Sequence, residues 1–256
     1  MRAFDFRNPM FVASLQPRIA APTDPNFADV VLLLHMDGAN GGTSFPDNSN
    51  SAHTVTAVGN ANTNTSVKKF GTASLQEDGN GDYLSIPDSS DFDIGLPVGY
   101  SNEPFTIEFW ARLNSTGGTQ MFLGKGGGSA SWNSSTGFQY IFFIQSSILY
   151  FQFWQSGFSP NTISASIASL GLTTNTWYHF AISYDGTTTE AYFNGSRFGT
   201  STGGYNSPSS ATDFRVGGAT PFYYLDGYID EFRITKGSSR YTGTTLTVPT
   251  AAFPNS

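Results

Sequence analysis

The nine residues FTIEFWARL, at positions 105–113, decide the fold class of this 256-residue chain. Their apolar members are Phe105, Ile107, Phe109, Ala111 and Leu113, and the residues between them are Thr106, Glu108, Trp110 and Arg112. An alternation of period two places the two sets on opposite faces of an extended strand. The stretch therefore predicts a β-strand with one face in a hydrophobic core.

Neighbouring segments carry the same signal. VVLLLHMDG (30–38) is apolar on nearly both faces, which is typical of a strand inside a sandwich. FQYIFFIQ (138–145) and ILYFQFWQ (148–155) predict two aromatic-rich strands that follow one another closely. Together these segments predict a meander of antiparallel strands.

Turn signals and composition agree with short strands. The dipeptides Ser146-Ser147, Asp185-Gly186 and Asn194-Gly195 separate strand-like segments, and the last two tolerate the positive φ of primed hairpin turns. Charged residues make up 12% of the chain and aromatic residues 15%, with 28 glycines, a composition that suits strands joined by tight turns. No segment has a long apolar period of 3.6 residues, so we expect little helix.

Charge and cysteine content exclude several classes of function. Twelve Lys and Arg stand against 19 Asp and Glu, and the formal net charge of −7 argues against nucleic acid and anionic membranes as partners. The chain has no cysteine, so disulfides and thiol chemistry are excluded. No apolar run approaches the roughly 18 residues that span a bilayer, and we expect no secretory signal peptide.

The first 27 residues differ from the rest. Four prolines disfavour a continuous helix or a central strand there: Pro9, Pro17, Pro22 and Pro25. Two interpretations stay open, a disordered terminus or an extended anchor that docks its apolar side chains in another subunit. We divide the chain into an N-terminal arm, residues 1–27, and a domain with an extended C-terminal tail, residues 28–256.

The loop EDGNGDYL (77–84) resembles a calcium loop at first sight, because Asp78, Asn80 and Asp82 stand at its positions one, three and five. A calcium loop of the EF-hand type also needs Gly at position six and Glu at position twelve, and these places hold Tyr83 and Ser89. The stretch is better explained as a turn between two strand ends that pair, at 75–77 and 82–86. A bound calcium remains the alternative.

Asp230 and Glu231 lie in YIDEFRIT (228–235), the last predicted strand. Strict alternation places Asp230 inward with Phe232, where its carboxylate needs hydrogen bonds or a cation. It places Glu231 on the opposite face, beside Arg233. A structural, hydrogen-bonded Asp230 is favoured over a metal ligand, and the pair cannot straddle one substrate bond.

Five segments, taken in order, resemble the laminin-G-like branch of the concanavalin A-like lectin/glucanase fold over about residues 29–254: LLLHMDG, FGTASLQEDGNGDYLSIPDSSDFDIG, FTIEFWARL, TWYHFAISYDGTTTEAYFNG and GYIDEFRITKGSSRYTG. The resemblance implies an all-β, two-sheet antiparallel jelly-roll sandwich. The ending ITKGSSRYTG…TVPTAAFP looks like the version found in bacteriophage structural proteins. It therefore implies a virion protein, with virion subunits as partners of the arm and a symmetric or homo-oligomeric assembly.

An enzyme is not expected. Retaining glycoside hydrolases of this fold resemble one another in an ExDxxE strand motif, and none of the five glutamates begins one: Glu77, Glu103, Glu108, Glu190 and Glu231. The three histidines, His35, His53 and His179, lack the close spacing of a metal site, and no G-x-S-x-G elbow is present. We expect no catalytic site, no metal and no cofactor.

Binding is the remaining chemistry. Sugars are held by aromatic faces that stack on their C–H surfaces, with a few polar side chains around them. Aromatic residues in or beside Asn- and Ser-rich loops are the candidates, and we select Trp132, Trp154, Tyr205 and Tyr223 as ligand-binding residues. For any one of them, packing in the core or at the rim is the more usual explanation.

The favoured hypothesis is a non-enzymatic bacteriophage virion protein, a capsid decoration or a tail or fibre component, located in the virion. Its lectin-like domain would adhere to a host-surface glycan. The alternative is a free carbohydrate-binding module, and a glycan-degrading enzyme is the third hypothesis.

Overall fold

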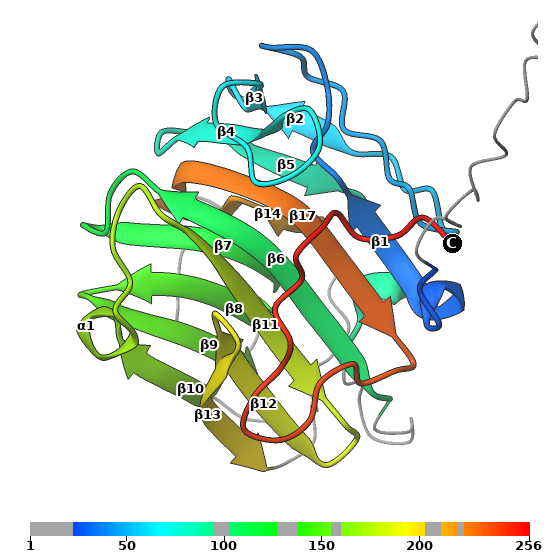
Figure 1. Cartoon of the computed structure of the whole chain (residues 1–256), viewed down its shortest axis with the longest axis vertical. Helices are drawn as coiled ribbons and strands as arrows, with labels where there is room; N and C mark the ends of the chain where they lie inside the picture. Colours follow the sequence, from blue (N-terminus) through cyan, green and yellow to red (C-terminus); the bar gives the residue numbers. More distant parts are fainter. Residues whose placement is uncertain (1–22, 95–102, 127–137, 155–159, 203–210, 220–222) are drawn as a thin grey trace, which may run out of the picture.

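The computed structural model describes residues 23–94, 103–126, 138–154, 160–202, 211–219 and 223–256. Two antiparallel sheets lie one on the other, as Figure 1 shows, and the described residues hold one four-residue α-helix, α1 (Ile167–Leu170). The predicted all-β sandwich is confirmed. None of the described helices is long and apolar enough to cross a membrane.

The first sheet is ordered β13-β12-β11-β6-β17-β4-β3, and β1 also pairs with β17. Its strands are β1 (Val30–Leu34), β3 (Asn62–Asn64), β4 (Ser74–Asp78), β6 (Phe105–Leu113), β11 (Trp177–Tyr184), β12 (Thr188–Phe193), β13 (Ser196–Thr202) and β17 (Asp226–Lys236).

The second sheet is ordered β10-β9-β8-β7-β14-β5-β2. Its strands are β2 (Thr56–Val58), β5 (Tyr83–Ile86), β7 (Thr119–Gly126), β8 (Phe138–Gln145), β9 (Ile148–Trp154), β10 (Pro160–Ser166) and β14 (Phe214–Val216). A small separate hairpin pairs β15 (Gly218–Ala219) with β16 (Tyr223–Tyr224), and two short 3-10 helices span Phe27–Asp29 and Ser90–Phe92.

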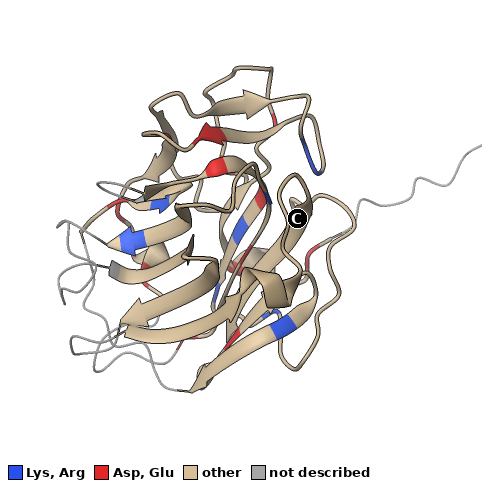
Figure 2. Cartoon of the chain, turned by 90° about the vertical axis from the view of Figure 1, so that its left-hand side faces the viewer, with Lys and Arg blue, Asp and Glu red and all other residues tan. Residues whose placement is uncertain are grey.

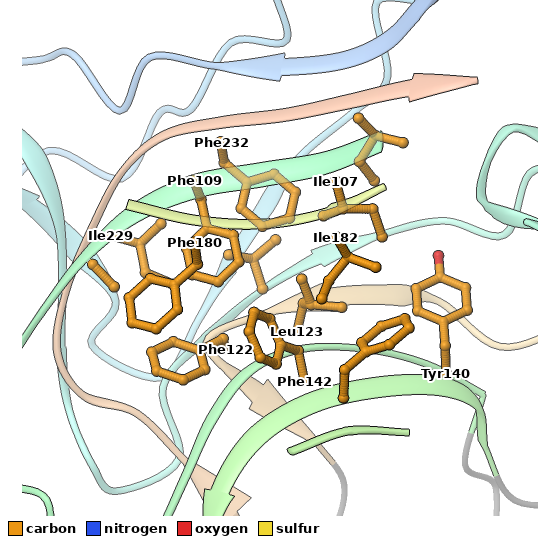
Figure 3. Close-up of a cluster of buried hydrophobic side chains, with 14 of the residues drawn as sticks. Ile107, Phe109, Phe122, Leu123, Tyr140, Phe142, Phe180, Ile182, Ile229 and Phe232 are labelled. Carbon is orange, nitrogen blue, oxygen red and sulfur yellow. The ribbon is translucent and has the colours of Figure 1, made fainter. Parts of the chain in front are cut away.

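The alternation in FTIEFWARL forms as predicted. β6 lies between β11 and β17, and its odd-numbered residues are buried in the core between the sheets. Phe109 is central there, because its ring centroid lies 5.3 to 5.8 Å from those of four other phenylalanines. Figure 3 shows these side chains from both sheets pointing toward one another: Phe122, Phe142, Phe180 and Phe232. Aromatic burial of this kind supplies much of the folding free energy.

Two of the predicted hairpin turns are confirmed, and the predicted pairing of the strand ends at 75–77 and 82–86 is wrong. Ser146 and Ser147 both have positive φ between β8 and β9, as do Asn194 and Gly195 between β12 and β13. By contrast, β4 and β5 do not pair, since β4 belongs to the first sheet and β5 to the second. The turn at 78–82 is therefore a corner that carries the chain from one sheet to the other.

The outer face of the first sheet is covered by the C-terminal tail, residues 237–256, which crosses β6, β11 and β12 in Figure 1. Contacts run along its length: Ser239 bonds Ser183, the Gly243 amide donates to Glu190, and Thr245 bridges to Ser196. The even-numbered residues of β6 therefore lie in a second, polar interior instead of in solvent.

Glu108 is the centre of this polar interior, and its side chain is fully buried. One carboxylate oxygen accepts bonds from Nε and Nη2 of Arg233, at 3.0 and 2.7 Å. The other accepts from the Tyr241 hydroxyl at 2.7 Å and lies 3.2 Å from Nε2 of His179. One carboxylate thus joins β6, β11, β17 and the tail, and His179 is a packed strand residue, as predicted.

Asp24 extends the network to the start of the described chain. Its carboxylate accepts from Arg233 at 2.8 Å and from both terminal nitrogens of Arg240 at 2.9 and 2.7 Å. Its backbone amide donates to the carbonyl of Ser256 at 2.6 Å. The beginning and the end of the domain are therefore fixed at the same place.

Replacing Glu108 by Gln should lower the free energy of unfolding by about 3–5 kcal/mol, because Arg233 would then be buried without its main counter-charge. Urea unfolding at neutral pH measures this loss. Glu103→Gln is the matched control, since the Glu103 side chain is 44% exposed and lies 3.7 Å from Lys236; its effect should stay within about 1 kcal/mol. Equal effects of the two changes would contradict the role given to Glu108.

Candidate functional site

The outer face of the second sheet carries a band of aromatic side chains, here called the aromatic band. Its first half is a cluster on β7, β8 and β9, where Met121, Ile141, Phe143 and Trp154 are buried and the rings of Tyr150 and Tyr223 pack against them half-buried. Phe143 and Tyr150 stack at 5.0 Å between ring centroids with an interplanar angle of 19°. The four buried side chains are already covered within the chain, so the two half-buried tyrosines carry the ring surface that this half exposes.

The second half of the aromatic band lies over β5 and β14. The rings of Tyr83 and Tyr224 stack at 6.4 Å with an angle of 20°, and both are half-buried. The guanidinium carbon of Arg215 lies 4.6 Å from the Tyr83 ring centroid. This half presents aromatic faces together with a cation.

The hairpin β15–β16 joins the two halves. It lies over the middle of the sheet, and consecutive tyrosines on β16 point to either side, Tyr223 toward the first half and Tyr224 toward the second. A Cβ at Gly218 would lie 2.8 Å from the Cβ of Tyr83, so glycine is what lets the hairpin approach β5 so closely. Charged residues are few and scattered on the side of the molecule seen in Figure 2.

The structure brings together two of the four residues predicted to bind a ligand. Trp154 and Tyr223 belong to the same half of the aromatic band, although Trp154 is 3% exposed and lies within the packed cluster. Trp132 and Tyr205 lie outside the described residues. The ligand-binding role of all four stays a prediction.

Several members of the aromatic band are not among the residues selected from sequence, Tyr150, Tyr83 and Arg215 among them. Tyr150 has the same strand parity as Trp154, so the alternation in ILYFQFW could have found it. Tyr83 and Arg215 come from strands that are distant in sequence and adjacent in the sheet. Their neighbourhood follows from the topology, which local patterns do not reveal.

The acidic loop at 78–82 uses its carboxylates to hold its own backbone. Asp82 accepts bonds from the amides of Asn60 and Asp78 at 2.8 and 3.1 Å, and Asp78 accepts from the amide of Asn80 at 2.9 Å. The prediction of a turn is confirmed. Among the described residues, no group of three or more His, Asp or Glu side chains is placed to hold a metal ion.

Asp230 is buried and hydrogen-bonded, as predicted, but on the other side of the sheet. A β-bulge between Asp230 and Arg233, with Glu231 at φ 50°, breaks the alternation. Asp230 therefore lies opposite Trp110 on the outer face and accepts from the amides of Lys69 and Phe70 at 2.7 and 3.1 Å.

Glu231 corrects a second detail of the sequence interpretation. It does not pair with its neighbour Arg233, which binds Glu108 and Asp24. Glu231 instead contacts Nδ1 of His35 at 2.9 Å and accepts from the amide of Phe253 at 2.7 Å.

Glu77 carries a buried carboxyl group. It lies between the sheets, and neither of its oxygens has a hydrogen-bond partner in the part of the chain that the structure describes. A Cβ at Gly217 would lie 1.8 Å from one of these oxygens, so glycine makes room for the carboxylate. Burial, helped by the charge of Asp82, raises the pKa of Glu77 well above its usual range, and we expect it to be protonated in the folded chain.

The chain belongs to the concanavalin A-like lectin/glucanases superfamily, whose laminin-G-type family model matches residues 78–239. The laminin-G-like resemblance seen in the sequence motifs is thereby confirmed, and the bacteriophage context stays a prediction. No curated protein matches the chain.

Several solved structures share the fold. The binding domain of botulinum neurotoxin serotype D is 14% identical with a TM-score of 0.60, over 84% of this chain and 50% of that one. A ligand-binding domain of the same serotype, in complex with N-acetylneuraminic acid, is 15% identical with a TM-score of 0.58, over 84% and 49%. The binding domain of Paraclostridial Mosquitocidal Protein 1 is 11% identical with a TM-score of 0.57, over 84% and 50%. This chain thus spans about half the length of each of these structures, and the likeness establishes a lectin-like fold.

Buried carboxylates with opposite pKa shifts should place the stability maximum on the acidic side of neutrality. Burial alone would raise the pKa of Glu108, but Arg233 and His179 lower it to about 2, so its stabilisation is lost as the pH falls toward that value. Burial raises the pKa of Asp230 to about 7, so its stabilisation is lost as the pH rises from about 4 to about 7. Burial also raises the pKa of Glu77, so its stabilisation is likewise lost as the pH rises above the usual range of a glutamate.

Thermal unfolding between pH 3 and pH 8 tests this balance. We expect the highest Tm near pH 4 to 5, and a smaller fall toward pH 8 in the Asp230→Asn and Glu77→Gln variants. An unchanged slope in both variants would contradict the assignment of the pH dependence to these two carboxylates.

Proposed function

We propose that the chain is a non-enzymatic display domain of a bacteriophage particle, which binds a glycan of the host surface through the aromatic band. The observation that carries the proposal is the aromatic band itself. Half-buried tyrosines on both sides of the β15–β16 hairpin provide ring surface of the kind that packs on the C–H surfaces of sugars.

The state of the glutamates supports a binding role over hydrolysis. A glycosidase needs two carboxyl groups that face a substrate from opposite sides. Glu108 is fully buried and is held by Arg233, His179 and Tyr241, and Glu77 is buried between the sheets. Neither can approach a sugar without opening the fold.

Attachment through the N-terminal arm is supported by the anchoring of the domain at Asp24. Asp24 is fixed by Arg233, by Arg240 and by the carbonyl of Ser256. A pulling force applied to the preceding residues is therefore transmitted to the rigid sandwich at Asp24. In Figure 1 the C-terminus lies on the side of β1, and α1 with the neighbouring edge strands lies on the opposite side. A domain held at β1 therefore presents its far edge outward.

Binding through the aromatic band predicts a loss of glycan recognition in ring-removing variants. Tyr83→Ala and Tyr223→Ala should each weaken binding to the best ligand of a glycan array by roughly three- to tenfold, as expected for one lost aromatic contact. Trp177→Ala is the control, because Trp177 is half-buried at an end of β11 in the other sheet. Silence of the intact chain on a broad array, or equal losses in all three variants, would contradict the proposal.

Anchoring by the arm predicts that a chain lacking residues 1–22 folds but is absent from purified particles. Mass spectrometry of the particles measures its copy number, and circular dichroism checks the fold. The truncation ends before Asp24, because losing Asp24 would also remove the partner of Arg233 and Arg240. Particles that carry the truncated chain at the full copy number would refute anchoring by the arm.

A further inference from the structure

A pocket of about 650 Å³ lies at the edge of the sandwich, is lined by none of the residues of the aromatic band, and is here called the edge pocket. It opens where β10, α1 and the start of β11 meet the β12–β13 hairpin. Its lining includes Leu170, Tyr178, Phe193, Phe198, Asn194 and Arg197. The volume is within the range of pockets that hold small ligands.

The edge pocket is bounded by rigid backbone. At Gly199 the edge strands of the two sheets touch, since a Cβ there would lie 2.4 Å from a methyl carbon of Ile163 on β10. On the other side α1 ends at Gly171 in the left-handed conformation, with φ 68°. The Tyr178 hydroxyl donates to the carbonyl of Gly171 at 3.1 Å, which fixes the tyrosine ring against the end of α1. The walls of the pocket are therefore fixed by the backbone of the fold.

Aromatic rings form the apolar part of the edge pocket. Tyr178 and Phe193 lie 4.8 Å apart between ring centroids at an angle of 34°, and Phe198 lines the same space from β13. Tyr178 and Phe198 are half-buried, so part of each ring surface is open to the pocket. Such surfaces suit the C–H face of a sugar ring.

Arg197 supplies the charge of the edge pocket. One terminal nitrogen binds Glu190, and its backbone amide donates to the carbonyl of Thr244 at 3.0 Å. Within the part of the chain that the structure describes, Nε and the second terminal nitrogen have no hydrogen-bond partner, and the side chain is 29% exposed. These two donors match the two oxygens of a carboxylate.

Glu190 does not compete for those donors. Its carboxylate is only 10% exposed and is already bound by the Tyr192 hydroxyl at 2.8 Å and the Gly243 amide at 3.0 Å, as well as by the first nitrogen of Arg197. No other acidic side chain lines the described part of the pocket. The exposed amide of Asn194 adds a neutral hydrogen-bonding group at the hairpin turn.

We propose that the edge pocket is a second carbohydrate site, which binds a sugar residue bearing a carboxylate, with the ring on Tyr178 and Phe198 and the carboxylate on Arg197. The inference rests on the proposed function in taking a glycan as the class of ligand. It places the site on the edge that faces away from the anchored end of the domain.

Saturation-transfer NMR on the full chain tests the proposal, with N-acetylneuraminic acid and glucuronic acid as probes and glucose and N-acetylmannosamine as neutral controls. We expect an acidic sugar to bind and the neutral sugars to bind at least tenfold more weakly, as for the loss of a charged hydrogen-bonded contact. Arg197→Gln should weaken binding of the acidic sugar by a similar factor. Equal binding of acidic and neutral sugars, or no binding of either acid, would overturn the proposal.

Further variants separate effects on the site from effects on the fold. Ala165→Met narrows the edge pocket and leaves both residues of the Arg197–Glu190 ion pair in place, and it should also weaken binding of the acidic sugar. The Tm of the variant checks that it folds. Lys68→Gln, at an exposed cation outside both sites, should leave binding of the acidic sugar unchanged. An equal loss in the Lys68 variant would contradict the assignment to Arg197. Loss of acidic-sugar binding in an Arg215→Gln variant alone would refute the edge pocket, whereas loss in the Arg197 and Ala165 variants alone would support it.

Discussion

The buried carboxylate of Glu108 is the interaction on which the arrangement of the molecule depends. It satisfies Arg233, His179 and Tyr241 together, and through Arg233 it also fixes Asp24. The outer face of the first sheet is therefore closed by the tail, and its polar side chains become a second interior. The aromatic band lies on the outer face of the second sheet, and the edge pocket lies at the edge of the sandwich.

The fold class follows from local patterns because burial between two sheets enforces a period of two. FTIEFWARL lies in the sheet as its alternation predicts, and the turn at Asn194-Gly195 has the positive φ that these residues favour. The alternation fails at Asp230, where one residue at positive φ moves the side chain to the other face. Such a bulge is a compromise among three neighbouring strands, and no local pattern encodes it.

The candidate site could be predicted in part, for a similar reason. Trp154 and Tyr223 were chosen as aromatic residues near polar loops, and the structure places them in one cluster. Tyr83 joins the same surface because β5 lies beside β14, a pairing between segments more than 120 residues apart. The sequence does not indicate Arg197 as a binding residue, because the donors that its guanidinium has available depend on the ion pair with Glu190. Site geometry is set by long-range topology.

One hydrogen bond, from the amide of Asp24 to the carbonyl of Ser256, means that the chain enters and leaves the sandwich at adjacent points. A module of this kind can interrupt a surface loop of an unrelated protein without forcing the two stems of that loop apart. It can equally be given new termini elsewhere once its own are joined by a short linker. The sandwich can thus be inserted into another protein as a unit that keeps its own packing.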